Sequence, residues 1–294
     1  TFIRQQTERM NGASLVLFHG YFPNEYRDGS VTGFICPRPR TAIDRLRRQI
    51  DLRARKHTYR QIEEACLFRL IRSRGCQAVF AHYGPTGAEL SDFCRRHHLP
   101  LIVHFHGYDA HQADVVENYG SRYRAMGACA AAIIVVSQAM RDALLELGIP
   151  GNKIHCIPYG IDLDRFSVQE RAGEAPHFLA VGRFVDKKAP GLLVLAFQRV
   201  LAACPGARLT ILGDGPLFES VDTMVDALGL RQSVDLPGAV GHESVAEQMR
   251  HADIFVQHSV IPRHGERRGD SEGTPVAILE AAASDLTTLQ AATD

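Results

Sequence analysis

The feature that most constrains the fold of this chain is a regular alternation of short apolar runs with amphipathic stretches. The strand-like runs are Leu15–Phe18, Ala78–Ala81, Leu101–Phe105, Ala132–Val136 and Ile154–Ile157 in a first series, and His177–Val181, Ala207–Leu212, Ser233–Leu236 and Asp253–Gln257 in a second. Helix-like stretches lie near Ala42–Arg74, Thr86–His97, Ser137–Leu147, Ala189–Ala203, Pro216–Leu228, Ser244–His251 and Pro275–Ala283. This order predicts an α/β protein with parallel sheets covered by helices on both faces.

The rhythm breaks between the two series, in the segment Pro158–Arg171, which is rich in proline, glycine and charged residues. Such a composition is typical of a linker. A chain of 294 residues is long enough for two domains of ~100–200 residues each. We therefore expect two Rossmann-like domains, 1–165 and 166–294, whose ligands bind in a cleft beyond the carboxyl ends of the strands. The fingerprint G-x-G-x-x-G does not occur, which argues against a nicotinamide dehydrogenase.

Charge and cysteine content narrow the classes of partner. Basic and acidic residues balance at 33 each, which gives no sign of nucleic-acid binding. The segment Arg38–Arg74 departs from this overall balance, because it contains twelve basic residues and only four acidic ones. This segment could make a peripheral contact with an anionic membrane surface or with an anionic acceptor. The alternative is that it forms a solvated helix face. Seven cysteines without a C-x-x-C pair predict reduced thiols in a cytoplasmic protein. If the basic segment contacts a membrane, that membrane surface would be the inner face.

Two further features of the sequence concern membranes and chain ends. The longest apolar stretch, Ala128–Val136, is far shorter than the ~20 residues of a spanning helix, and no signal peptide is visible. The chain starts at Thr1 and not at Met, so we expect a fragment.

The strongest chemical signal is the segment Asp270–Ser284, DSEGTPVAILEAAAS. Thr274 is suited to cap a helix that begins at Pro275, and Gly273 allows a ligand to approach the backbone closely. The free amides at such a helix start attract an anion, for example a diphosphate. The alternative is an ordinary capped helix on the surface.

Two carboxylates in this segment lie eight residues apart, Glu272 and Glu280. Along a helix this separation is roughly 12 Å. Two carboxylates that act on one glycosidic bond lie ~5–9.5 Å apart, so this pair does not fit that role. The spacing suits the two ends of one elongated ligand, with a sugar at one end and a ribose at the other.

A second signal lies in Ala180–Pro190, AVGRFVDKKAP, where Arg183 directly follows a strand-like run and Lys188 comes five residues later. Two cations at the carboxyl end of a strand can hold a diphosphate and stabilise its charge as it leaves. The alternative is a surface loop with solvated cations.

A third signal is the end of the run in Leu101–His111, LIVHFHGYDAH. His104 and His106 share one strand face, but no further spaced ligands indicate a metal site. His106, Gly107 and Asp109 at a strand end better suit contacts with an acceptor or a donor sugar. A structural histidine remains the alternative.

These segments together resemble glycosyltransferase family 4, whose architecture is GT-B. Its E-x7-E motif is matched by Glu272 and Glu280, its G-R…K pair by Gly182, Arg183 and Lys188, and its interdomain P-x-G-I/V-D…F by Pro158, Gly160, Ile161, Asp162 and Phe166. The stretches GDGPL and ADIFVQHS also sit where the family would place them, and FHGYD resembles the acceptor-side loop of bacterial polysaccharide members. The resemblance covers essentially the whole chain.

The resemblance implies a retaining enzyme that moves a sugar from a UDP- or GDP-sugar to a saccharide or lipid-linked acceptor in polysaccharide biosynthesis, without a metal or other cofactor. Residues 1–165 would form the acceptor-side domain and 166–294 the donor domain. The implied donor-binding residues are Gly182, Arg183, Lys188, Glu272, Gly273, Thr274 and Glu280. The implied catalytic residues are His106, Glu272, Arg183 and Lys188, and the implied acceptor side is His106, Gly107 and Asp109.

The sequence also departs from the family pattern. The first strand and its glycine-bearing loop are expected to be missing, and after Ser284 the stretch DLTTLQAATD replaces the usual buried strand. We therefore expect the final strands of the second sheet to be missing as well. Ala189 stands where a glycine commonly follows the lysine. These departures leave two alternatives open: a nucleotide-sugar epimerase of the same fold, and a truncated remnant without catalytic activity.

Overall fold

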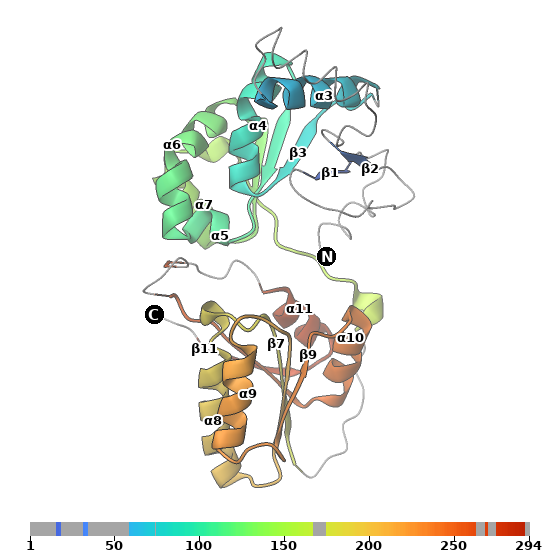
Figure 1. The fold of residues 1–294 in the computed structure, drawn as a ribbon, viewed down its shortest axis with the longest axis vertical. Coiled ribbons are helices and arrows are strands. Elements are labelled where there is room, and N and C mark those ends of the chain that lie inside the picture. The colour runs from blue at the N-terminus through green and yellow to red at the C-terminus, as the bar shows by residue number, and fades with distance from the viewer. Residues whose placement is uncertain are drawn as a thin grey trace.

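The computed structural model describes residues 59–73, 75–166, 175–262, 268–269 and 275–291, and the backbone of two short strands. These strands, β1 (Val16–Phe18) and β2 (Thr32–Phe34), pair in parallel. The rest of the described chain forms two α/β halves joined by an extended segment, as Figure 1 shows.

The first half is built on a parallel four-stranded sheet of order β3-β4-β5-β6. Its strands are β3 (Val79–His82), β4 (Leu101–His104), β5 (Ala132–Val135) and β6 (Ile154–Cys156), and its helices are α3 (Tyr59–Ser73), α4 (Gly84–Arg96), α5 (Tyr108–His111), α6 (Ala113–Cys129) and α7 (Gln138–Glu146). Val103, Phe105 and Tyr123 are fully buried in its core. The Ser137 hydroxyl accepts a hydrogen bond from the amide of Met140 and so caps α7.

The second half is built on a parallel five-stranded sheet of order β11-β10-β7-β8-β9. Its strands are β7 (His177–Val181), β8 (Arg208–Leu212), β9 (Val234–Gly238), β10 (Ile254–His258) and β11 (Thr287–Ala291), and its helices are α8 (Pro190–Ala203), α9 (Phe218–Ala227), α10 (His242–His251) and α11 (Val276–Ala283). The predicted fold class, two α/β domains with parallel sheets, is confirmed. Among the described helices, none has the length and apolar content needed to cross a bilayer.

Some element predictions were wrong. Thr287–Ala291 forms β11, parallel to β10, where the strand was expected to be missing. β-Branched threonines favour a strand, and the neighbouring β10 supplies the hydrogen-bonding ladder.

The long helix α6 was not predicted, because its glycines and mixed polarity blur the helical period. One of these glycines, Gly127, allows close packing, since a Cβ there would lie 3.0 Å from the Ile149 side chain. Of the helix expected over Ala42–Arg74, the structure describes only the part from Tyr59.

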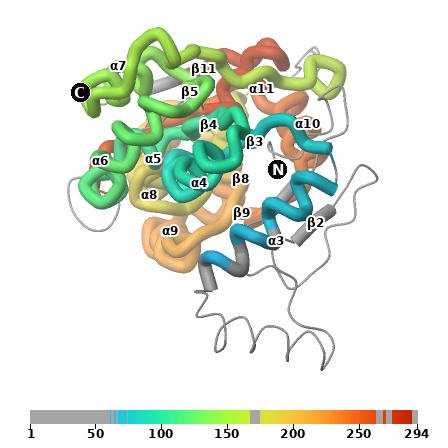
Figure 2. Tube along the Cα trace, turned by 90° about the horizontal axis from the view of Figure 1, so that it is seen from above, coloured from blue at the N-terminus to red at the C-terminus, as the bar shows by residue number. Residues whose placement is uncertain are grey.

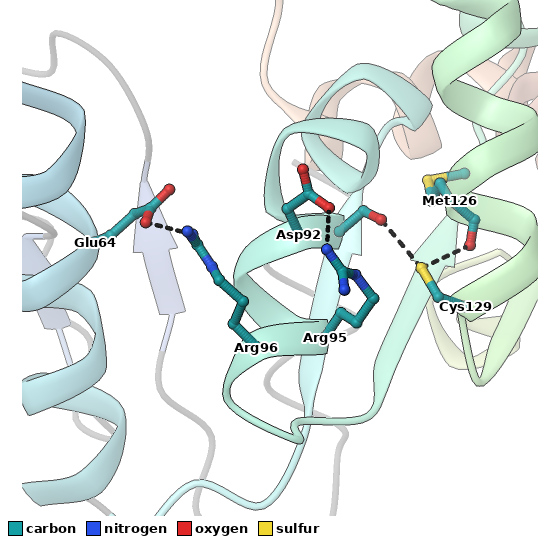
Figure 3. Close-up of polar contacts among 7 residues, drawn as sticks. Glu64, Asp92, Arg95, Arg96, Met126 and Cys129 are labelled. Carbon is teal, nitrogen blue, oxygen red and sulfur yellow. Dashed lines mark hydrogen bonds and ion pairs between the residues drawn. The ribbon is translucent and has the colours of Figure 1, made fainter.

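Polar contacts tie the helices of the first half to one another (Figure 3). Arg96 on α4 forms a hydrogen-bonded ion pair with Glu64 on α3. On the other side of α4, the Ser91 hydroxyl lies 3.1 Å from Cys129 Sγ on α6. Both views of the fold place α4 between α3 and α6 (Figures 1 and 2). These bonds fix the helix that begins directly after β3.

The two halves also touch through a loop that follows β10. The amide of Ala113 donates a hydrogen bond to the carbonyl of Arg268 at 2.9 Å. The Arg268 guanidinium pairs with Glu117 at 2.9 Å, although both side chains are more than half exposed. Residues of the second half thus contact the start of α6 in the first.

Two loops interlock at the carboxyl edge of the second sheet. A Cβ on Gly213 (φ +140°) would lie 1.9 Å from the carbonyl oxygen of Gly182, so only glycine fits there. The amide of Gly182 donates to the Leu212 carbonyl at 2.9 Å, and the amide of Phe184 donates to the Asp214 carbonyl at 3.0 Å. The loop after β8 therefore supports the loop after β7, which carries Arg183.

We expect Gly213→Ala to lower the free energy of unfolding by roughly 3 kcal/mol or more, because the new Cβ adds backbone strain to a clash with a carbonyl. Gly229→Ala is the matched control. Gly229 also has positive φ (+68°), but a Cβ there meets nothing within 4 Å. Its cost should be about 1–2 kcal/mol. Urea unfolding measures both values, and equal costs would contradict the interlock.

Candidate functional site

Three histidines gather at the carboxyl edge of the first sheet. His82 ends β3 and His104 ends β4, and the two are direct partners across the parallel ladder. His106 lies two residues beyond His104, which places it on the same face. His82 Nδ1 lies 3.0 Å from His106 Nε2, and His106 Nδ1 lies 2.6 Å from the hydroxyl of Tyr159. Strand register and the linker thus build one cluster from three segments.

The cluster is held in its neutral form by its surroundings. His104 is 4 % exposed, and both of its ring nitrogens are buried without a hydrogen-bond partner in the part of the chain that the structure describes. Burial lowers the pKa of His82 and the pKa of His104 to about 4, in the latter case with a further contribution from His82. Burial, and then His104 and His82, lower the pKa of His106 to about 2. At neutral pH these imidazoles therefore offer lone pairs, not positive charge.

Asp109 supports this cluster through hydrogen bonds from backbone amides. Its side chain has no exposed surface. Its Oδ2 accepts a hydrogen bond from the amide of Gly84 at 2.9 Å. Its Oδ1 accepts from the amides of His106 and Gly107, each at 2.9 Å. Burial raises the pKa of Asp109, and these amide bonds oppose that rise. The enclosed side chain contacts backbone amides at two strand ends and so positions His106. Its place on the acceptor side stays a prediction.

The cations of the second half gather after β7. A Cβ on Gly182 would lie 3.6 Å from carbons of the Lys188 side chain, so this side chain runs along the glycine. Gly182, Arg183 and Lys188 line one pocket together with Gln257 and His258 from the end of β10. Arg183 is exposed and Lys188 is half-buried. The predicted pair is therefore close in space, at the carboxyl end of a central strand.

The turn that presents Lys188 has an unusual backbone. Ala189 has φ +39° and ψ +53°, the left-handed region, which explains why a glycine would be favoured at this position. The ring Nε2 of His258 lies 3.1 Å from the Ala189 carbonyl oxygen and holds the turn against β10. Lys188 ends a short 3₁₀ turn, and α8 begins only at Pro190.

Glu280 is found in a second pocket. It is 6 % exposed on α11, and its Oε1 lies 3.3 Å from His242 Nε2 at the start of α10. Burial raises the pKa of Glu280, and the neighbouring His242 opposes the rise. The same pocket is lined by Tyr159, Phe166 and Val276. Its walls therefore come from both the linker and the second half.

The predicted donor site is thus only partly assembled by the described residues. Gly182, Arg183 and Lys188 share one pocket, whereas Glu280 lies in another. Glu272, Gly273 and Thr274 lie outside the described residues. The helix start was placed one residue early, because α11 begins at Val276 with Pro275 as its N-cap.

Sequence reasoning missed three residues that the structure brings to these sites. His82 was not linked to His106, although strand pairing in register was the signal that could have done so. Tyr159 was noted only as a variable position within the interdomain motif. His242 carried no signal, since its contact with Glu280 joins α10 to α11 through tertiary packing alone.

Comparison with solved structures identifies the fold. A structure of HepE from Anabaena in complex with UDP-glucose matches 89 % of this chain and 72 % of that one, with a TM-score of 0.65 at 14 % identity. Sucrose-phosphate synthase from Thermosynechococcus elongatus matches 77 % of this chain and 59 % of that one, with a TM-score of 0.62 at 18 % identity. The fold is the GT-B architecture of two Rossmann-like domains.

Comparison of sequences gives the family. The description Glycosyltransferase Family 4 matches residues 16–165, and Glycosyl transferases group 1 matches residues 163–292. The chain therefore belongs to glycosyltransferase family 4.

Curated relatives are similar over part of their length. The putative colanic acid biosynthesis glycosyltransferase WcaL of Salmonella typhimurium is 27 % identical over 209 residues, which are 69 % of this chain and 50 % of WcaL. The amylovoran biosynthesis glycosyltransferase AmsK of Erwinia amylovora is 30 % identical over 190 residues, 63 % of this chain and 45 % of AmsK. The chain spans about half the length of these relatives.

Acidification should destabilise the first half through the histidine cluster. Below pH 6.5 the unfolded chain binds a proton on each imidazole, whereas folded His104 does so only near its pKa of about 4. Unfolding is therefore favoured as the pH falls from 7 to 5, by about 1–2 kcal/mol from His104 alone. Unfolding free energies at both pH values should show this loss reduced in His104→Phe and unchanged in the exposed control His155→Gln. Equal losses in wild type and His104→Phe would contradict the burial argument.

Replacing Ala189 by glycine should stabilise the protein by about 0.5–1 kcal/mol, because it removes a left-handed penalty that exceeds the extra entropy of glycine in the unfolded chain. Ala202→Gly, on the exposed side of α8 with ordinary helical geometry, is the control and should cost about 1 kcal/mol. Thermal unfolding compares the two variants. A lower melting temperature for Ala189→Gly would show that the turn does not strain alanine.

Proposed function

We propose that this chain is the body of a retaining glycosyltransferase. It moves a sugar from a nucleoside-diphosphate donor, a UDP- or GDP-sugar, to a saccharide or lipid-linked acceptor in polysaccharide biosynthesis. The names of WcaL and AmsK, both polysaccharide biosynthesis glycosyltransferases, support the pathway class. The UDP-glucose complex of HepE supports the donor class.

The observation that carries the proposal is the paired cation site after β7. Arg183 and Lys188 share a pocket with Gly182, along which the Lys188 side chain runs. Cations positioned at a leaving diphosphate stabilise the charge that develops as the donor bond breaks. Parallel sheets bind ligands at this edge, so the location agrees with the chemistry.

In the proposed step, a hydroxyl oxygen of the acceptor forms a bond to the anomeric carbon while the bond from that carbon to the diphosphate oxygen breaks. The hydroxyl proton passes to a leaving phosphate oxygen on the same face, which retains the anomeric configuration. Arg183 and Lys188 hold the diphosphate, and the proposal needs no metal ion for this step. Glu280 binds the ribose hydroxyls, and His106 lies beside the anomeric carbon. Glu272, Gly273 and Thr274 complete the donor site in this proposal.

The acceptor side is part of the same proposal. A lipid-linked acceptor lies in an anionic surface, and the basic segment Arg38–Arg74 would contact that surface. The described part of this segment is α3, which exposes Arg69 and Arg72 near its end. Their positive charge supports a peripheral contact on the side of the acceptor domain.

Substitutions of Arg183 or Lys188 should weaken binding of the donor nucleotide without disrupting the fold. Arg183→Gln and Lys188→Gln each remove a charge-assisted bond of about 1.5–3 kcal/mol, so binding of UDP or GDP should weaken about 10- to 100-fold. Arg208→Gln is the matched control, because Arg208 is an exposed arginine at the opposite end of the sheet, where β8 begins. Calorimetric titration with both nucleotides measures the change.

Three results would contradict the proposal. The first is no binding of either nucleotide, which would favour a remnant without activity. The second is equal binding by Arg183→Gln and Arg208→Gln. The third is conversion of donor sugar to an epimer without acceptor, which would indicate an epimerase. Transfer of a labelled sugar, with the anomeric configuration of the product read by NMR, tests retention.

A further inference from the structure

The histidine cluster at the end of β3 and β4 has the composition and spacing of a metal site. The candidate ligand atoms of His82, His104 and His106 lie within 4.8 Å of one another. We propose that these three side chains bind one divalent transition-metal ion of the zinc class through their imidazole nitrogens. Three imidazoles with one open position form a known type of tetrahedral zinc site.

The geometry of the nearest pair is close to that of two ligands on one ion. Nitrogens bound at ~2.0–2.1 Å to a tetrahedral ion lie ~3.3 Å apart. His82 Nδ1 and His106 Nε2 lie 3.0 Å apart and face each other in a hydrogen bond. A small outward rotation of the two rings, which are near parallel at 19°, opens this distance to the required value. The ion can therefore take the place of the proton shared by His82 Nδ1 and His106 Nε2, and the backbone need not move.

His104 is the independent observation that points to a ligand. It is 96 % buried, and neither ring nitrogen has a hydrogen-bond partner among the described residues. Its ring centroid lies 4.2 Å from that of His106 and 5.9 Å from that of His82. A buried imidazole without a partner is unfavourable unless something satisfies it. An ion between the three rings supplies that partner.

Tyr159 gives the site its outer contact. Metal-bound histidines usually donate their second ring N–H to an oxygen, which fixes the tautomer. The Tyr159 hydroxyl lies 2.6 Å from His106 Nδ1 and can accept that proton, which leaves Nε2 as the ligand atom. In the ion-free form His82 Nδ1 then donates to this Nε2. On binding, the His82 proton moves to the other ring nitrogen, so no net proton is released.

His82 and His106 are half-buried and not enclosed, so an ion can reach them from the surface. An ion held by His106 Nε2 denies that nitrogen to a sugar. If the proposed transfer is correct, the ion and the sugar exclude each other, and zinc inhibits transfer until a chelator removes it. This consequence rests on the proposed function, whereas the site itself does not.

Cobalt binding tests the site without any nucleotide or acceptor. The whole chain is titrated with Co²⁺, whose visible d–d bands are intense only in four-coordinate sites, and Zn²⁺ is then added in competition. We expect one equivalent to bind, with bands that Zn²⁺ abolishes. His82→Gln and His104→Gln should lose the bands, and His155→Gln, an exposed histidine on β6, should keep them. Tyr159→Phe should bind about 10- to 100-fold more weakly.

Two outcomes of the cobalt titration overturn the proposal: no bands in the wild type, or bands that survive in His82→Gln and His104→Gln. If these variants fail to fold, X-ray absorption at the zinc edge of the wild type decides instead, because it counts bound imidazoles directly. Fewer than three overturns the site. Because donor binding is measured separately with the Arg183 variants, failure of the metal site and failure of the transferase proposal are distinguishable.

Discussion

The first half of this protein depends on one buried carboxylate. Asp109 has no exposed surface, yet it accepts hydrogen bonds from amides that belong to two different strand ends. One of these, Gly84, begins the helix after β3, and another, His106, follows β4. Removal of this side chain would leave its buried amide partners unpaired, which is costly in a protein interior. The position of His106 relative to His82 is therefore set by a side chain with no exposed surface.

In the second half, the described loops at the carboxyl edge of the sheet are positioned without a buried acidic side chain of this kind. These loops interlock because Gly213 and Gly215 allow backbone to approach backbone more closely than any side chain permits. This contact fixes the start of the loop with Arg183, and the bond from His258 to the Ala189 carbonyl fixes its end. In both halves the chemistry-bearing side chains are placed by contacts with the backbone at the carboxyl edge of a parallel sheet.

Periodicity and motif spacing predicted the two parallel sheets and most element positions, because burial patterns along one segment are local information. The same reasoning failed for α6 and β11. In α6, Gly127 serves a close contact with Ile149, so tertiary packing overrides the local signal. In β11 the strand is decided by its neighbour β10. For the sites, the cation pair follows from a motif within one loop. The contacts of Tyr159 with His106 and of His242 with Glu280 join distant segments, so no single stretch of sequence contains them.

The pairing of His82 with His104 has a consequence for how this chain can change over evolutionary time. Side chains on neighbouring positions of a strand point to opposite faces, so a shift of one residue in register turns the whole strand over. A single inserted or deleted codon within Val79–Ala81 would turn the His82 imidazole toward the opposite face of the sheet while leaving every histidine in the sequence. An insertion in the exposed turn near His98, between α4 and β4, would leave the register intact. Length variation among homologous chains should therefore be tolerated in such turns and selected against in the strand.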